Sequence, residues 1–264
     1  MAVPTSSSAA ADPASAGGLV YCYGVTWSDV GAPGGRTGVG GEKVGSVAHG
    51  DLAALTSPVA SANVRAKRRD LLNHSEVLAA ALERGTVLPL RFGIVFENAT
   101  ALADGFLHPR HDELAALLRR FEGRVELTVR AHYEQEAILA EIVRESPRVA
   151  RLREKTRDGP AAATYPLKVE LGERVAGELQ DRTNRDRKAL LDRLLPLSVD
   201  VQVDQEPIEH QVLRASFLVE RRKVTKFDDA MDDLARQHAG RIRFKYVGPL
   251  APHSFVDVGM PEAR

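Results

Sequence analysis

The residues of this chain that could support catalysis or metal binding are, above all, eight histidines and a single cysteine. His108 and His111 lie close in sequence, but Pro109 between them prevents a regular helical pair of ligands. The helix predicted around His74 lacks the second histidine of a His-Glu-x-x-His site. Solvated or boundary positions explain these histidines more simply, so we expect no metal and no cofactor.

Nucleophilic catalysis needs a nucleophile, a base and an orienting group within reach of one another. The sequence has no Gly-x-Ser-x-Gly elbow, and Cys22 lies inside an apolar strand, where a small buried thiol is usually inert. The acid pairs at 228–229 and 232–233 recur at helical spacing, which indicates a solvated helix face rather than a cation site. We therefore predict that the chain is not an enzyme.

Two further patterns suggest ligands but fit them poorly. The glycine-rich segment 31–41 lacks the Gly-Lys-Ser/Thr and the following helix of a phosphate-binding loop, so it is predicted to be a flexible, hairpin-like loop. The basic cluster of Arg65 and 67–69 has no interleaved aromatic residues, which indicates a solvated helix start rather than an RNA-binding surface.

Arg91 is the unusual charge, because it lies between Leu90 and Phe92 in a predicted apolar strand. A buried, unpaired guanidinium would cost several kcal/mol, so Arg91 must pair with an acceptor, face solvent or meet a partner. We expect it to be paired or at an interface.

The composition agrees with these exclusions. The 264 residues include 36 Lys and Arg and 36 Asp and Glu, and the resulting net charge of zero argues against a dedicated nucleic-acid or membrane binder. A single cysteine excludes the disulfide-rich secreted class. The sequence shows no signal peptide and no apolar run long enough for a transmembrane helix, so we expect a cytoplasmic protein.

Periodic apolar patterns predict an α+β fold. In the first half, the predicted strands are 19–27, 44–49, 86–96 and 124–130, and the predicted helices are 65–84 and 111–121, with a helical turn after Asp51. Leu71, Leu72, Leu78, Ala81 and Leu82 are expected to form the buried stripe of the first helix. A four-stranded sheet with two helices on one face resembles the ferredoxin-like fold.

The second half repeats this organisation without an evident first strand. The predicted helices are 131–145, 146–157, 167–195 and 225–239, with Thr225 as a cap paired to Asp228, and the predicted strands are 197–203, 212–219 and 242–246. We therefore predict two modified βαββαβ-type units joined by helices. The expected divisions are a disordered tail at 1–18, an N-terminal domain at 19–145, a helical linker at 146–165 and a C-terminal domain at 166–264.

Several short motifs, in their order and spacing, resemble the gas vesicle protein family of the F/L type. The central signature runs from His74 through Pro89, Arg91, Phe92 and Gly93. The strand at 123–129 carries Glu126 after Gly123, and the closing motif consists of Gly248, Pro249, Pro252, Ser254 and Phe255. Leu250 and His253 depart from the aromatic residue and the tyrosine that are common at these positions of the family.

The resemblance implies a non-enzymatic accessory protein of gas vesicles. Its partners would be the small hydrophobic shell protein and other accessory proteins, with no nucleic acid and no membrane involved, and it would assist nucleation or assembly of the shell. One mechanism is capping of a shell-protein strand at an unpaired sheet edge, for which the strand with Pro89 is the candidate. A regulatory or small-molecule-binding ferredoxin-like module is the alternative, because that fold hosts many functions.

Overall fold

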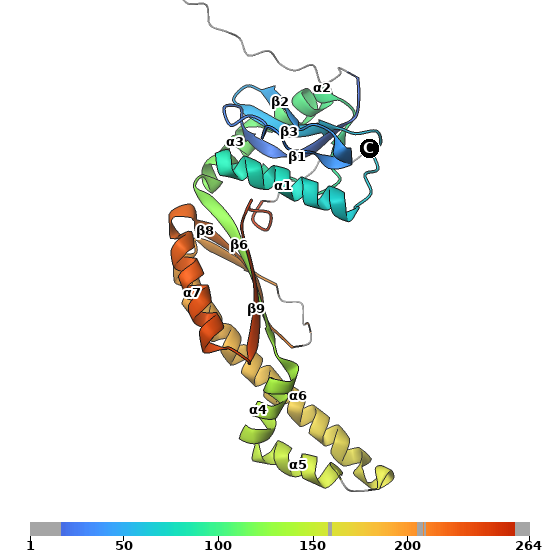
Figure 1. Ribbon diagram of the computed structural model, residues 1–264, viewed down its shortest axis with the longest axis vertical. Coiled ribbons are helices and arrows are strands. Elements are labelled where there is room, and N and C mark those ends of the chain that lie inside the picture. Colours follow the sequence, from blue (N-terminus) through green and yellow to red (C-terminus); the bar gives the residue numbers. More distant parts are fainter. Residues whose placement is uncertain (1–16, 158–159, 205–207, 209, 257–264) are drawn as a thin grey trace, which may run out of the picture. The chain divides into compact units, whose positions relative to one another are not determined.

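The computed structural model describes residues 17–157, 160–204, 208 and 210–256, and it has the predicted α+β fold with two sheets (Figure 1). The tail expected at 1–18 lies, apart from Gly17 and Gly18, outside the described residues. Helices and strands follow one another as β1 (Val20–Trp27), β2 (Gly45–His49), β3 (Leu52–Pro58), α1 (Arg68–Arg84), β4 (Val87–Pro89), β5 (Val95–Phe96), α2 (Ala99–Leu102), α3 (His111–Phe121), β6 (Arg124–Tyr133), α4 (Gln135–Glu145), α5 (Pro147–Arg157), α6 (Ala161–Leu194), β7 (Asp200–Val203), β8 (Gln211–Glu220), α7 (Val224–Gln237) and β9 (Ile242–Leu250).

The first sheet is built around β1. Its strand order is β2-β3-β1-β4, and β5 also pairs with β1, next to β4 along the same side of the strand. All of these pairings are antiparallel. Residues 20–26 of β1 are all buried, so this strand has no solvent-facing side.

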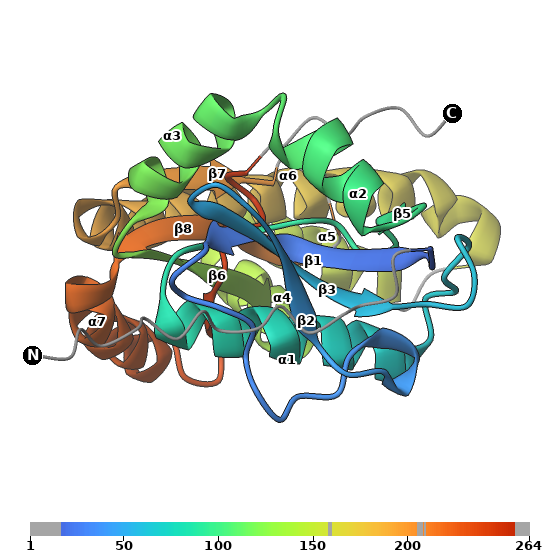
Figure 2. The same cartoon turned by 90° about the horizontal axis from the view of Figure 1, so that it is seen from above.

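Helices cover both faces of this sheet. Figure 2 shows α1 on one side of β1 and β3, and α2 and α3 on the other. The prediction placed both helices on one face, and it was wrong for a physical reason. A strand buried on both faces lacks the alternation that would identify a solvent side.

The segment after Asp51 is a strand rather than the predicted helical turn. Residues 52–57 of β3 are buried, and β3 pairs with β2 in a register that sets His49 opposite Leu52. The two residues between them, Gly50 and Asp51, form a tight hairpin turn in which Gly50 has a φ of +61°. Positive φ is the requirement of such turns, so the Gly-Asp pair was the signal for a hairpin.

The predicted strand 86–96 is interrupted. Only 87–89 and 95–96 pair with β1, and residues 90–94 form a loop between them. The predicted capping of the last helix by Thr225 is also wrong. A short helical turn at Arg221–Lys223 leads directly into α7, and no side chain caps its first turn.

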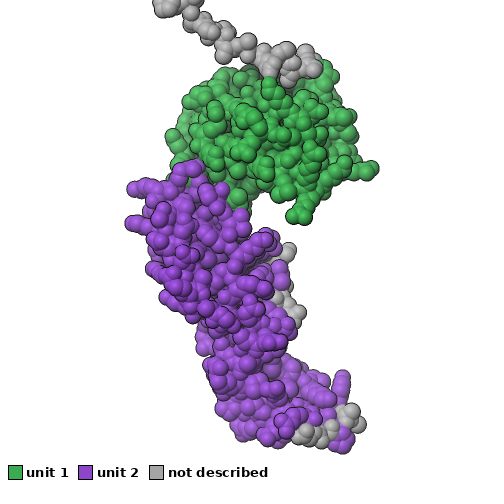
Figure 3. All heavy atoms as spheres, in the orientation of Figure 1, with its two compact units in different colours: residues 1–124, 250–264 green, residues 125–249 purple. Residues whose placement is uncertain are grey.

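The chain divides into two compact units, coloured separately in Figure 3. Unit 1 comprises 1–124 and 250–264, and unit 2 comprises 125–249. This division differs from the expected boundaries of 19–145, 146–165 and 166–264. Strand β6 joins the second sheet, and the expected linker contains α5, which packs against α6 within unit 2.

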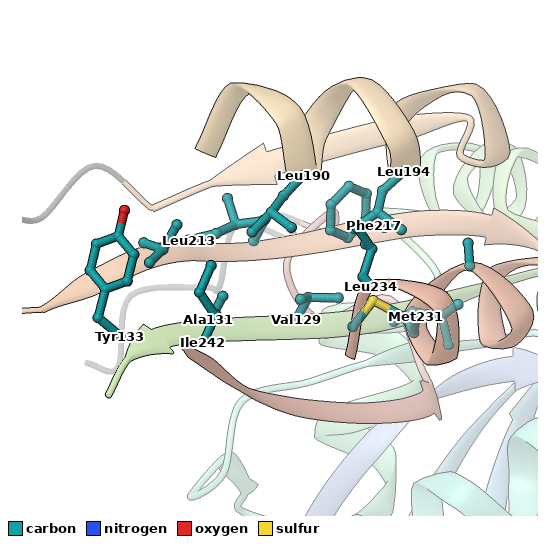
Figure 4. Packing of buried hydrophobic residues seen from close by; sticks show 14 of the residues in the cluster. Val129, Ala131, Tyr133, Leu190, Leu194, Leu213, Phe217, Met231, Leu234 and Ile242 are labelled. Atoms are coloured by element: carbon teal, nitrogen blue, oxygen red, sulfur yellow. The ribbon is translucent and has the colours of Figure 1, made fainter. Parts of the chain in front are cut away.

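Unit 2 has the order strand, helices, strand, strand, helix, strand, and its sheet runs β7-β8-β6-β9. Strand β6 therefore supplies the first strand that the sequence analysis found missing. Alternate residues along a strand share a face, and those of β6 and β8 pack on α6 and α7. Figure 4 shows Val129 and Ala131 from β6 beside Leu213 and Phe217 from β8, below Leu190 and Leu194 of α6.

Replacing Phe217 by alanine should strongly destabilise unit 2. Phe217 is fully buried and packs against Phe227 with ring centroids 5.3 Å apart. We expect a loss of about 3–5 kcal/mol in the free energy of unfolding, measured by urea denaturation with circular dichroism. The control Val169→Ala, at a position 45% exposed on α6, should change it by less than about 0.5 kcal/mol. Equal effects of the two variants would contradict this description of the core.

Candidate functional site

The loop 90–94, which carries most of the central signature, is fixed to β1 at three points. The backbone N–H of Leu90 donates to the carbonyl of Tyr23 at 2.8 Å, and that of Cys22 donates to the carbonyl of Ile94 at 2.9 Å. Between them, the N–H of Gly93 donates to the hydroxyl of Tyr21 at 3.1 Å. Gly93 has a φ of +95°, which side chains other than that of glycine adopt only with strain.

His74 stabilises this arrangement from α1. The Tyr21 hydroxyl accepts from the N–H of Gly93 and forms a second hydrogen bond, 2.9 Å long, with Nδ1 of His74. Burial, with a smaller effect of the nearby His253, lowers the pKa of His74 to about 4, so the ring is neutral at pH 7. Phe92 packs against His74 and Tyr21, with ring centroids 5.7 and 5.8 Å away. His74, Phe92 and Gly93 therefore belong to one structural cluster.

The remaining residues of the signature have different environments. Pro89 is buried at the end of β4, where it lies opposite Gly24 of β1. Arg91 is exposed, and it forms no ion pair with any residue in the described part of the chain. Of the two expected alternatives, an ion pair within the described fold is not formed, and a position at an interface stays a prediction. The strand is interrupted at this point, and the side chain reaches solvent.

The glycine-rich segment is anchored rather than free. The Tyr23 hydroxyl accepts from the N–H of Val39 and contacts Ser57 Oγ, both at 2.7 Å. Asn73 of α1 donates to the carbonyl of Gly38 at 2.8 Å. The expected hairpin-like shape is present as an isolated bridge between Thr37 and Lys43, but the expected flexibility does not fit these contacts. The tyrosines of β1, which sequence reasoning left out of the site, hold both loops.

The other motif residues occupy separate places in the two units. Glu126 is buried near the start of β6, and a side chain on Gly248 would clash with its carbonyl at 2.9 Å and with Leu127 at 2.6 Å. Because Gly248 has no side chain, β9 can lie close to β6 at this point. Pro252 and Phe255 are buried in unit 1, where the N–H of Phe255 donates to the carbonyl of Pro252 in a turn.

The histidines and acids considered in the sequence analysis form polar contacts but no metal site. His108 Nδ1 lies 3.0 Å from His49 Nε2, and His111 Nε2 lies 2.5 Å from Asp51 Oδ1. Among the described residues, no group of three or more His, Cys, Asp or Glu side chains is arranged to hold a metal ion. Burial raises the pKa of Cys22 to about 12, so the thiol is protonated and unreactive.

Unit 2 contains an ion-pair network that sequence reasoning missed. Arg182 of α6, only 4% exposed, pairs with Glu178 at 2.6 Å, Glu145 at 3.2 Å and Glu141 at 3.3 Å. Arg241 pairs with Glu141 at 2.6 Å and with Asp186 at 2.8 Å. The Arg241 hydrogen bond holds the pKa of Glu141 below its usual value. The network joins α4, α6 and the start of β9, and the long sequence separations of its members hide it from a pattern search.

Three hollows lined by described residues are open to solvent. One of about 560 Å³ lies beside the start of α1, and its lining includes Val39, Pro58, Val64, Lys67 and Asp70. Another of about 340 Å³ is formed by residues 108–113, and one of about 280 Å³ lies between charged side chains of α5 and α6. None of the helices in the described part of the chain has the length and hydrophobicity that a membrane span requires.

Comparison with known proteins decides the family. The family model described as "Gas vesicle synthesis protein GvpL/GvpF" matches residues 19–257. The chain belongs to the GvpL/GvpF family. This confirms the resemblance that the motifs suggested, and it associates the chain with gas vesicles.

Individual GvpL/GvpF proteins resemble the chain over almost its whole length. Gas vesicle protein F from Streptomyces sp. (strain CB03234) is 35% identical over 240 residues, which cover 90% of this chain and 99% of the relative. Gas vesicle protein L from the same strain is 28% identical over 258 residues, covering 91% and 93%. The crystal structure of GvpF from Anabaena sp. PCC7120 superposes with a TM-score of 0.77 at 23% identity, covering 92% of this chain and 100% of that structure. The structural likeness confirms the fold.

Removing the Tyr21 hydroxyl should destabilise unit 1. In Tyr21→Phe, the N–H of Gly93 and Nδ1 of His74 both lose their partner, and a buried group left unsatisfied costs about 1–3 kcal/mol. Urea denaturation followed by fluorescence of Trp27, the single tryptophan, would measure the loss. Tyr165→Phe, at a position 69% exposed, is the matched control and should have almost no effect. A Tyr21→Phe variant as stable as the control would contradict the role given to this hydroxyl.

The pair of His111 and Asp51 should stabilise unit 1 mainly between about pH 4 and pH 6.5. The Asp51 hydrogen bond raises the pKa of His111, so its contribution is complete below the unfolded value near 6.5 and is lost as pH rises through the folded pKa. The same bond lowers the pKa of Asp51, whose contribution is lost towards acid. The difference in melting temperature between wild type and His111→Gln should therefore be largest near pH 5–6 and small at pH 8. Asp51→Asn should give the same profile, and a difference independent of pH would contradict the pairing.

Proposed function

We propose that the chain is a non-enzymatic accessory protein of gas vesicles that acts in the cytoplasm. It binds the small hydrophobic shell protein, together with other accessory proteins, and assists nucleation or assembly of the shell. The match of the GvpL/GvpF family model to residues 19–257 carries this proposal. The packing agrees with this proposal. Most of the described apolar side chains of both sheets pack against helices of the chain itself, so strand edges and helix surfaces are what a partner can contact.

The strand with Pro89 is not a suitable edge for docking. Although β4 ends the strand order of the first sheet, residues 87–90 are all buried. A strand from another protein could not reach their backbone groups without displacing part of unit 1. We therefore look for the docking edge at another strand than β4, which contains Pro89.

Strand β2, at the opposite edge of the same sheet, offers accessible backbone groups. In a hairpin with a two-residue turn, the residues next to the turn form a hydrogen-bonded pair, and such pairs alternate along the ladder. His49 pairs with Leu52, so Val47 and Gly45 also bond to β3, while the N–H and C=O groups of Ser46 and Ala48 point away from it. Ser46 and Ala48 are both exposed.

β2 also lacks the devices that protect sheet edges from pairing. Lysine, proline and other charged residues on an edge strand oppose the addition of another strand. Gly45–His49 contains no lysine, arginine, acid or proline. By contrast, the edge strand β9 exposes Arg243, Lys245 and Pro249, and the edge strand β7 begins with exposed Asp200. Docking of a shell-protein strand on β2 follows as the favoured geometry.

Co-expression with the shell protein tests the function and the edge together. Wild type should yield a soluble complex under conditions in which the shell protein alone aggregates. Ala48→Pro removes the outward N–H without removing a bond to β3, and it should reduce recovery of the complex by about tenfold or more. Ala48→Ser keeps the N–H and is the matched control.

Circular dichroism must first show that both variants are folded. Equal complex formation by Ala48→Pro and Ala48→Ser would contradict docking on β2. Failure of the wild-type protein to keep the shell protein soluble or to bind it would contradict the proposed function itself.

A further inference from the structure

The outer side of α1 carries apolar residues that the helical pattern assigned to the core. Leu71 is 41% exposed and Leu72 is 52% exposed, whereas His74, Val77 and Leu78 of the same helix are buried. Apolar residues that follow a helical pattern but remain exposed often form a functional surface, because they contact another molecule instead of the core.

Small residues continue this exposed surface along the helix. Ser75 and Ala79 are exposed on the same side as Leu72, together with Glu76, and Ala79 lies seven positions after Leu72, a rise of about 10.5 Å. Leucines beside small residues let a second helix approach closely over about two turns. We name Leu71, Leu72, Ser75 and Ala79 the α1 outer face.

A basic cluster adjoins the α1 outer face at the start of the helix. Arg65, Lys67, Arg68 and Arg69 are exposed, and none of them forms an ion pair with a described residue. Asp70, the acid of the first turn, instead accepts a hydrogen bond from the N–H of Gly40 at 3.1 Å. Cations at the positive end of a helix dipole are also unfavourably placed. An acidic partner would relieve both the repulsion among these cations and their interaction with the dipole.

A recess lies beside this cluster. The hollow of about 560 Å³ at the start of α1 has apolar lining residues, Val39, Pro58, Val59 and Val64, and charged ones, Glu42, Arg65, Lys67 and Asp70. It is large enough to receive an apolar side chain from a segment lying on the helix. Lys67 lines this recess and lies one helical turn before Leu71, so the recess adjoins the start of the α1 outer face.

We propose that the α1 outer face and its basic cluster bind an acidic amphipathic helix of a partner protein. The leucines would contact the apolar stripe of that helix, and its carboxylates would pair with the basic cluster, as in helix-in-groove recognition. A second copy of this chain fits poorly in a symmetric contact, because two basic clusters would face each other. A lipid surface also fits poorly, because the opposite side of α1 is buried and only two large apolar residues could insert. The inference does not depend on the proposed docking at β2.

Fluorescence anisotropy with a synthetic peptide tests the proposal. The probe is a labelled helix of leucine, alanine and glutamate with leucines at i, i+3, i+4 and i+7, and the reference peptides are a scrambled version and a version with lysine in place of glutamate. Wild type should bind the amphipathic acidic peptide at least about tenfold more tightly than either reference, and binding should weaken as salt rises.

Variants of the full chain locate the site. Leu71→Ser with Leu72→Ser, and separately Arg68→Glu with Arg69→Glu, should each weaken binding by about tenfold or more while the protein stays folded. Val169→Ser and Arg153→Glu, exposed on α6 and α5, are the matched controls and should bind as wild type does. Equal binding of the scrambled peptide, or equal affinity of all variants, would overturn the proposal.

Two further measurements separate other occupants. Sedimentation of the protein with phosphatidylserine-containing vesicles, if lost in the Leu71/Leu72 variant while the peptide does not bind, would show a lipid surface as the occupant and overturn the proposal. Concentration-dependent self-association abolished by the same variants, again without peptide binding, would assign the face to a second copy and also overturn it.

Discussion

In unit 1, water does not reach strand β1, so the polar groups of this strand must find hydrogen-bond partners within the protein. Strand β1 is buried on both faces, and its backbone pairs with β3 on one side and with β4 and β5 on the other. Its tyrosine hydroxyls have no solvent to bond, so they bond loops instead. Tyr21 holds Gly93 and His74, and Tyr23 holds Val39 and Ser57. Because buried polar groups find partners, these two hydroxyls hold the loop 90–94 and the glycine-rich segment 31–41 in place.

Much of the fold was predictable where one face of an element is solvated. The helix at 111–121 and the apolar faces of β6 and β8 follow directly from periodicity. Periodicity identifies the face of a strand but not its neighbour, so β6 was assigned to the first sheet instead of the second. For Leu52–Pro58 it failed altogether, because a strand buried on both faces shows no alternation, and only the Gly50-Asp51 turn marks the hairpin.

The site was predictable in its residues but less so in their roles. The motif identified His74, Phe92 and Gly93 as a group, and the structure brings them together around Tyr21. Tyr21 itself was missed, because a tyrosine in an apolar strand looks like core until its hydroxyl partners are known. Leu71 and Leu72 fit the helical stripe of α1, but that stripe is wider than the surface the sheet covers. Arg182 also pairs with Glu141 and Glu145, which lie far from it in sequence, and no local pattern reveals those two pairs.

The contrast between the charges of the two units has a consequence for how the molecule responds to ionic strength. Arg182 is 4% exposed and pairs with three carboxylates, whereas Arg65 and Lys67–Arg69 are exposed and form no ion pair with a described residue. Dissolved ions screen exposed charges far more than enclosed ones. Concentrated electrolyte therefore leaves the joint between α4, α6 and β9 intact while it weakens any attraction that the start of α1 exerts on an acidic partner. High salt can therefore dissociate an acidic partner from the start of α1 while the ion-pair network of unit 2 stays formed.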